Sequence, residues 1–139
     1  MEIKTTYQGD LRFASEGAFP TIMDAAAAAG GRAEGPTPKE LVLHGLAGCT
    51  GMDVATILSK RKVTYDSFSI EVEADQTQNH PKVFKNIKVT FRFTADPKDR
   101  PKIERAITLS RENFCGVSAM LEKTATIDTE LVLTPTEQK

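Results

Sequence analysis

The feature that most constrains this chain is a helix signal that begins at Thr37. Thr37 is placed to cap the helix, Pro38 occupies the first turn, where its missing N–H costs nothing, and Glu40 can reach back in a capping box. The pattern continues from Leu41 to Leu58 with apolar residues around most of the circumference, and it ends in the basic run 60–62. A helix of this kind must be covered on several sides, so we expect the fold to be built around it.

Three glycines recur at every third position of this helix, at Gly45, Gly48 and Gly51. Each glycine costs a helix up to about 1 kcal/mol relative to alanine. That cost is understandable if another backbone or helix packs very close beside Cys49. A single small sheet covers one face of a helix, so a second subunit is a natural cover for the remaining faces, and we expect a homodimer.

Two later segments alternate strictly between apolar and polar residues, from Phe68 to Ala74 and from Ile87 to Phe93. This period predicts an antiparallel pair of strands with one solvent-exposed face. The exposed face carries acidic residues on the first strand and basic residues on the second. Such cross-strand pairs each stabilise a sheet by about 0.2–1 kcal/mol.

The N-terminal segment reads as short strands followed by a loop. Brief apolar alternations up to about Asp24 predict a small antiparallel meander. Residues 25–36 are alanine-rich but are interrupted by one Gly-Gly pair and one Gly-Pro pair, which break any helix and predict a loop. Functional residues often lie on such loops.

The C-terminal part predicts a second helix and a closing strand. Asp99 is placed to cap a helix that extends to Phe114, and Gly116 interrupts it. One or two further turns follow up to Lys123, and residues 125–133 read as a strand. Strands, helix, strand pair, helix and strand in this order indicate an α+β fold with segregated helices.

The composition indicates one domain, residues 1–139, which can bury roughly two thirds of its unfolded surface. Its 18 basic and 19 acidic residues give a net charge of −1, so the field expected of a protein that binds nucleic acid or anionic membranes is missing. We expect no nucleic-acid partner, no signal segment, no stretch as long as a membrane span, and a cytoplasmic location. In that reducing compartment, two cysteines are more often free, metal-bound or redox-active than structural.

Cys49 and Cys115 are the only cysteines, and each lies where a thiol could become reactive. They lack C-x-x-C spacing, which argues against a metal knuckle or a thioredoxin motif but allows a dithiol assembled in space. Asp53 follows Cys49 by four residues on the same helix face, where its carboxylate would oppose ionisation of the thiol unless it is itself paired. Cys115 directly precedes a helix start at Gly116, whose N–H groups could stabilise a thiolate.

Positive charge near Cys49 would have to come from Arg12, Arg32 or Lys39. We favour Arg32, because it lies in the glycine-rich loop that leads into the helix and because a guanidinium stays charged. His44 lies some 140° around the helix from Cys49 and is a poor base for it. No metal, flavin or nucleotide signature is present, so no cofactor is expected.

The segments around both cysteines resemble the OsmC/Ohr family of osmotically inducible and organic hydroperoxide resistance proteins. The matching segments are 35–41, 46–50 and 113–118, followed by a β-strand, and the resemblance runs over nearly the whole chain. It implies an intertwined α+β homodimer in which antiparallel sheets wrap around two central helices. It also implies active sites at the subunit interface.

The resemblance further implies a thiol peroxidase that acts on organic hydroperoxides. Cys49 corresponds to the peroxidatic thiol and Cys115 to the resolving thiol, which would close an intramolecular disulfide that an external dithiol reduces. Arg32 and Glu40 complete the predicted catalytic set, with Arg12 as the alternative arginine. An apolar lining would favour organic peroxides, and its candidates are Leu41, Leu46, Met52, Phe114 and Met120.

One departure from the family pattern lies at the start of the long helix. The family peroxidases carry a glutamate directly after the proline, where this chain has Lys39, and Glu40 follows one position later. One residue turns a helix by about 100°, so Glu40 does not simply inherit the glutamate's role. A capping role alone would also explain Glu40.

Two other functions fit the same residues. The chain could form a non-catalytic dimer that binds an apolar small molecule at the subunit interface, with both cysteines only packing, because free cysteine is often a buried small hydrophobe. It could instead catalyse general thiol–disulfide exchange. The three functions differ in what the protein turns over. A peroxidase turns over peroxides, an exchange enzyme turns over disulfides, and a ligand-binding dimer turns over neither.

Overall fold

The computed structural model describes residues 1–137. The chain divides into two compact units, residues 1–44 and residues 45 onward, which we call the N-terminal and the C-terminal unit. The division falls within the long helix α1 (Pro38–Lys60).

The N-terminal unit contains the predicted meander. Strands β1 (Thr5–Tyr7), β2 (Phe13–Ser15) and β3 (Ile22–Met23) pair antiparallel in that order. The alanine-rich segment that follows is a loop with one 3₁₀ turn at Ala27–Ala29. Both predictions for this part of the chain are confirmed.

Asp24 organises that loop from a buried position. Its carboxylate accepts hydrogen bonds from the backbone N–H groups of Ala25 (2.7 Å), Arg32 (3.3 Å) and Glu34 (3.1 Å). Burial raises the pKa of Asp24, but these donors and the charge of Arg12 outweigh it, so the pKa lies below its ordinary value. The charged carboxylate therefore holds the loop that carries Arg32.

The start of α1 has the predicted capping box. The backbone N–H of Thr37 donates to the carboxylate of Glu40 at 2.7 Å, and the backbone N–H of Glu40 donates to the hydroxyl of Thr37 at 3.3 Å. Pro38 is the first residue of the helix. The local signal therefore placed this boundary correctly.

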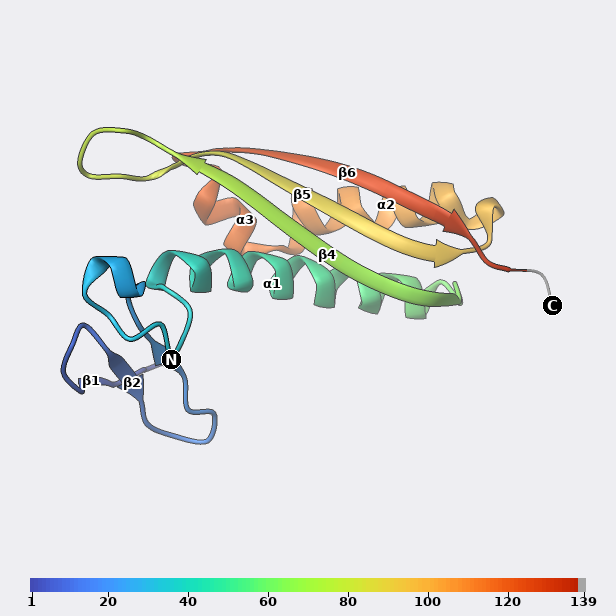
Figure 1. The fold of residues 1–139 in the computed structure, drawn as a ribbon. Coiled ribbons are helices and arrows are strands. Elements are labelled where there is room, and N and C mark those ends of the chain that lie inside the picture. The colour runs from blue at the N-terminus through green and yellow to red at the C-terminus, as the bar shows by residue number, and fades with distance from the viewer. Residues whose placement is uncertain (138–139) are drawn as a thin grey trace. The chain divides into compact units, whose positions relative to one another are not determined.

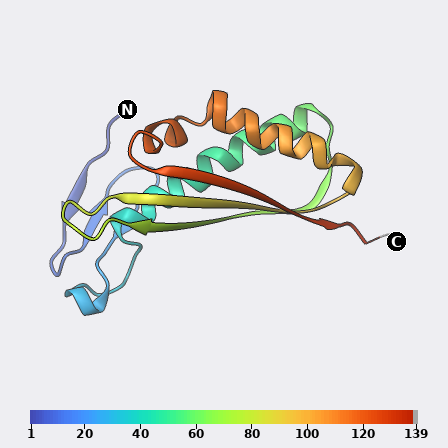
Figure 2. The same ribbon diagram turned by 90° about the horizontal axis from the view of Figure 1, so that it is seen from above.

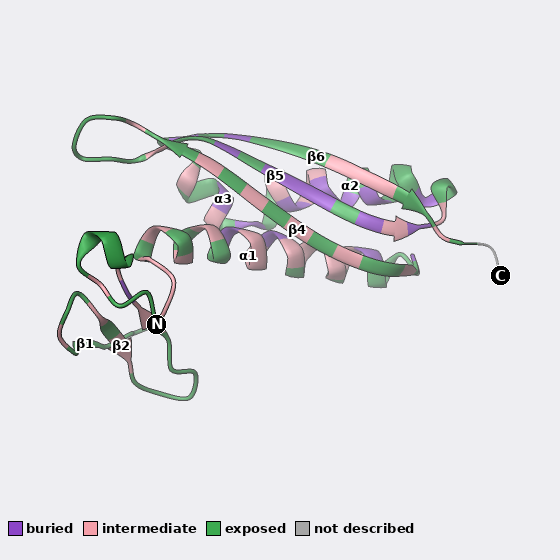
Figure 3. Ribbon diagram, in the orientation of Figure 1, coloured by how far each residue is buried: buried purple, intermediate pink, exposed green. Residues whose placement is uncertain are grey.

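Helix α1 is more apolar than the sequence analysis allowed. Its 23 residues include an 18-residue stretch with a mean hydropathy of 1.5, so by length and composition alone it could cross a membrane. The expectation that no stretch approaches a span was wrong, because residues 41–58 are mostly apolar and contain a single charged side chain, that of Asp53. Its buried residues lie at every fourth position on one face, namely Leu46, Thr50, Val54 and Leu58. Much of the helix is therefore uncovered in the single chain (Figure 3).

The C-terminal unit is built on a second three-stranded sheet. Strands β4 (Tyr65–Gln76) and β5 (Phe84–Ala95) form the predicted antiparallel pair, and β5 lies between β4 and β6 (Thr126–Pro135). Strand β6 runs parallel to β5, which differs from the antiparallel sheets that the resemblance implied. The helices between β5 and β6 return the chain to the same end of the sheet, and this crossover makes the parallel pairing possible.

One face of this sheet is covered and the other is exposed. Helices α2 (Arg100–Leu109) and α3 (Gly116–Leu121) lie on the same face as the C-terminal part of α1 (Figures 1 and 2). The core between them is apolar, and its fully buried members include Leu58, Phe91, Phe93, Ile103 and Ile127.

The exposed face carries a predicted charged pair between β4 and β5 and a further pair between β5 and β6. Arg92 on β5 binds the carboxylate of Glu71 on β4 through two hydrogen bonds of 2.7 and 2.9 Å. Lys88 on β5 pairs with Glu130 on β6 at 2.6 Å. The alternation of the strands thus predicted both faces of the sheet.

The prediction that the side chain of Asp99 caps α2 was wrong. A 3₁₀ turn at Pro97–Asp99 precedes α2, and Asp96 caps this turn by accepting from the backbone N–H of Lys98 at 3.0 Å. Asp99 makes no side-chain capping bond and instead pairs with Lys102 at 2.8 Å. The side-chain cap therefore lies at Asp96, before the 3₁₀ turn, and not at Asp99.

Candidate functional site

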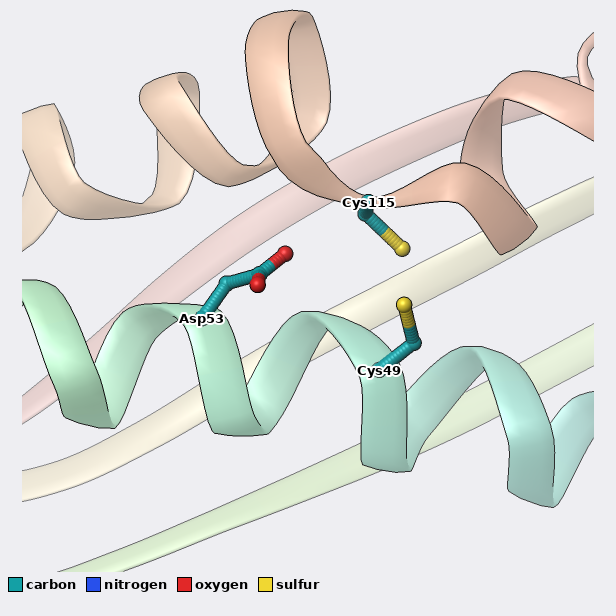
Figure 4. A group of neighbouring side chains, drawn as sticks. All are labelled: Cys49, Asp53 and Cys115. Atoms are coloured by element: carbon teal, nitrogen blue, oxygen red, sulfur yellow. The ribbon is translucent and has the colours of Figure 1, made fainter.

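Cys49 and Cys115 come together in the C-terminal unit. Cys49 lies in the middle of α1 and is half-buried, whereas Cys115 lies just before α3 and is only 2 % exposed. Their sulfur atoms and a carboxylate oxygen of Asp53 all lie within 4.8 Å of one another. Figure 4 shows the two sulfur atoms pointing toward each other, and both thiols are free. The fold therefore assembles a dithiol from distant parts of the sequence.

A change of helix type places Cys115 at this point. Helix α2 ends in a π-helical turn at Ser110–Phe114, where the backbone N–H of Cys115 donates to the carbonyl of Ser110 at 2.7 Å. Cys115 itself is extended, and α3 begins at Gly116, as the sequence predicted. The Cys115 sulfur caps α3 by accepting from the backbone N–H of Ser118 at 3.3 Å. Turns of this type are frequent at functional sites.

A buried polar network holds Asp53 beside the thiols. The hydroxyl of Ser110 donates to the Asp53 carboxylate at 2.9 Å, and the hydroxyls of Ser110 and Thr50 are 3.0 Å apart. Ser110 and Thr50 are both buried. Helical spacing from Cys49 predicts Asp53 at the site but not Ser110, because Ser110 lies at a core-facing position of the second helix.

The surroundings of Cys49 disfavour its thiolate. Burial is the largest influence and raises the pKa of the Cys49 thiol, and the neighbouring Cys115 and Asp53 raise it further. A hydrogen bond from the backbone N–H of Val117 acts in the opposite direction. The net shift is upward, so Cys49 is mainly a neutral thiol at neutral pH.

The two candidate arginines belong to the N-terminal unit and have partners there. Arg32 is exposed and binds Asp10 through two hydrogen bonds of 3.0 and 2.8 Å, which raise the pKa of its guanidinium. Arg12 pairs with Glu34 at 3.0 Å, and within residues 1–137 its buried Nε lacks a hydrogen-bond partner. The catalytic role predicted for either arginine stays a prediction.

Glu40 also lies in the N-terminal unit, in the capping box already described. Hydrogen bonds from the backbone and side chain of Thr37 lower the pKa of the Glu40 carboxyl group. These contacts are those of a helix cap, and the catalytic role predicted for Glu40 stays a prediction. His44 is exposed.

The predicted apolar lining divides into core and surface residues. Leu46 is fully buried in the core, so it is not available to a substrate. Met52, Phe114 and Met120 are 72 %, 61 % and 67 % exposed. Met52 and Phe114 are close in sequence to the two thiols and are the better candidates for contact with an apolar molecule.

The model of a known family matches most of the chain. Residues 30–130 match the family described as OsmC-like protein. The chain belongs to the OsmC-like family. Protein YhfA of Escherichia coli K12 is 32 % identical over 92 residues, which cover 66 % of this chain and 69 % of YhfA.

Solved structures of the OsmC-like fold agree with this assignment. A hypothetical protein from Aquifex aeolicus superposes with a TM-score of 0.83 at 23 % identity, covering 98 % of this chain and 97 % of its own. The organic hydroperoxide resistance protein OhrB of Bacillus subtilis superposes with a TM-score of 0.66 at 25 % identity, covering 95 % of this chain and 98 % of its own. Family membership and the close pair of cysteines together point to redox chemistry.

Proposed function

We propose that this OsmC-like protein is a thiol peroxidase that reduces organic hydroperoxides through Cys49 and Cys115. The observation that carries the proposal is the free dithiol, whose two sulfur atoms lie within 4.8 Å and face each other. A disulfide needs the sulfur atoms to approach to about 2.0 Å, which small side-chain movements can supply from this starting point. The similarity to a protein named for organic hydroperoxide resistance supports the same chemistry.

The difference in exposure supports different steps for the two thiols. Cys49 is half-buried and can meet a peroxide, whereas Cys115 is buried behind it. The Cys49 thiolate attacks the distal oxygen of the hydroperoxide, the O–O bond breaks, and a proton converts the leaving alkoxide to an alcohol. Cys49 is thereby oxidised to a sulfenic acid.

Cys115 completes the cycle. Its thiol attacks the sulfenic sulfur, so the disulfide forms and water leaves. The backbone N–H of Ser118, which already donates to the Cys115 sulfur, stabilises negative charge as it develops on that sulfur. An external dithiol then restores both thiols by disulfide exchange.

Exposed apolar side chains of the C-terminal unit support a homodimer as the working form. Met52, Phe114 and Met120 are large apolar side chains with more than half of their surface exposed. Exposed apolar surface of this extent is typical of protein interfaces. We expect sedimentation equilibrium at micromolar concentration to give twice the mass of the chain, and a monomer at that concentration would contradict a dimeric site.

The test of the proposed function is oxidation by one equivalent of cumene hydroperoxide. Reduced protein should promptly lose both free thiols and two hydrogens in intact mass, because one sulfenic acid condenses with the second thiol. Hydrogen peroxide at the same concentration should react more slowly, since it gains nothing from apolar contacts. Thiols that persist in excess cumene hydroperoxide would contradict the proposal and favour the non-catalytic dimer that binds an apolar ligand.

A further inference from the structure

The third member of the thiol cluster performs no step of the proposed peroxidase cycle. Asp53 places a carboxylate oxygen within 4.8 Å of both sulfur atoms, although a negative charge there raises the pKa of the Cys49 thiol (Figure 4). A peroxidase site gains from a cation at this position instead. The arrangement becomes favourable if a dication binds among the three groups, because one positive centre then attracts all of them.

We propose that Cys49, Cys115 and Asp53 form a binding site for Zn²⁺ that holds the dithiol in its reduced state. Two thiolates and one carboxylate are ligands that zinc accepts, whereas magnesium and calcium prefer oxygen alone. Three protein ligands leave the fourth tetrahedral position for water or another small ligand. The site needs only the thiols and the carboxylate, so it does not rest on the proposed peroxidase activity.

The geometry suits zinc after a small adjustment. Bonds of about 2.3 Å to sulfur and about 2.0–2.2 Å to oxygen place tetrahedral ligand atoms about 3.5–3.8 Å apart. The three ligand atoms already lie within 4.8 Å of one another. Contraction by at most about 1.3 Å is within the reach of side-chain rotation.

Each of the three ligand side chains also accepts a hydrogen bond from a neighbouring group. Ser110 donates to Asp53 at 2.9 Å, the backbone N–H of Ser118 donates to the Cys115 sulfur at 3.3 Å, and the backbone N–H of Val117 donates to Cys49. Groups that surround the direct ligands in this way orient them and strengthen metal sites. Ser110 is itself fully buried, so the carboxylate is held in one orientation.

Binding would change the chemistry of the dithiol. Zn²⁺ replaces the two thiol protons, which leave to solvent, and no electron is transferred. Each sulfur then donates one lone pair to the metal, which withdraws its negative charge and makes it a weaker nucleophile toward a peroxide or a sulfenic acid. Zinc therefore protects the reduced protein, and removal of zinc exposes the reactive pair.

The test is a titration of chelator-treated, reduced protein with Zn²⁺ in the presence of a chromophoric zinc indicator. We expect one equivalent of zinc per chain in the wild type and no binding by the disulfide form. Cys49→Ser and Cys115→Ser should each lose the site. Asp53→Asn, which keeps the shape of the side chain, should weaken binding at least about 10-fold. Asp128→Asn removes an exposed carboxylate of β6 and should bind like the wild type.

Co²⁺ gives a second readout that needs no variant. Bound cobalt should show a thiolate-to-metal charge-transfer band and the intense visible bands of tetrahedral coordination. Absence of zinc binding in the wild type, or unchanged binding in Asp53→Asn or in either serine variant, would overturn the proposal. Peroxide oxidation of the metal-free protein is measured separately, so the zinc site and the peroxidase can fail independently.

Discussion

Cys49→Ser is expected to reduce the consumption of cumene hydroperoxide to the rate without protein, whereas Cys115→Ser is expected to retain a single oxidation. The serine hydroxyl is not ionised at neutral pH and cannot replace a thiolate. Loss of an enzyme's nucleophile commonly costs at least about 10³-fold in rate. Cys115→Ser keeps the half-exposed Cys49, which should react once and stop, because no second thiol can condense with the sulfenic acid.

The two variants are separated by intact mass after one equivalent of peroxide. Cys115→Ser should gain one oxygen atom and react with a sulfenic-acid reagent such as dimedone, and Cys49→Ser should remain unmodified. Serine is close in size to cysteine, so both variants should keep the fold. Melting temperatures close to that of the wild type would check this. Oxidation of Cys115 in the Cys49→Ser variant at the wild-type rate would reverse the assignment of the two roles.

The fold was predictable where the signal lies in neighbouring residues. The capping box of Thr37 and Glu40 fixed the start of α1, and strict alternation fixed β4, β5 and the face that each residue takes. The direction of β6 was not predictable in this way, because the alternation of a strand is the same in parallel and antiparallel pairing. The uncovered surface of α1 was anticipated from its apolar circumference.

The site was predictable in its chemistry but only partly in its contacts. Motifs identified both cysteines, and helical spacing placed Asp53 on the face of Cys49. The hydrogen bond from Ser110 to Asp53 joins residues 57 positions apart, and no local pattern reports such a contact. The partner of Arg32 was not predictable either. A loop guanidinium can pair with any nearby carboxylate, and that of Arg32 pairs with Asp10.

Asp53→Asn is expected to shift the rate of peroxide oxidation toward lower pH in the metal-free protein. Burial, Cys115 and Asp53 all raise the pKa of the Cys49 thiol, so the wild-type rate should climb as pH rises through that raised pKa. Removing the carboxylate charge while keeping the side-chain shape lowers this pKa, so more of Cys49 is thiolate at neutral pH. A less basic thiolate is also less nucleophilic, with a Brønsted coefficient of about 0.4–0.5, so each tenfold gain in thiolate should raise the rate at pH 7 only about threefold.

The measurement is the second-order rate constant of Cys49 with cumene hydroperoxide between neutral and alkaline pH, in the presence of a metal chelator. The midpoint of the profile should lie lower in Asp53→Asn than in the wild type, and the plateau at high pH should be lower because the thiolate is weaker. Asp128→Asn serves as the control, since it removes an exposed carboxylate from the same unit and should leave the midpoint in place. A midpoint that rises in Asp53→Asn, or a rate that falls at every pH, would mean that the carboxylate accepts the proton of Cys49 instead of opposing its loss.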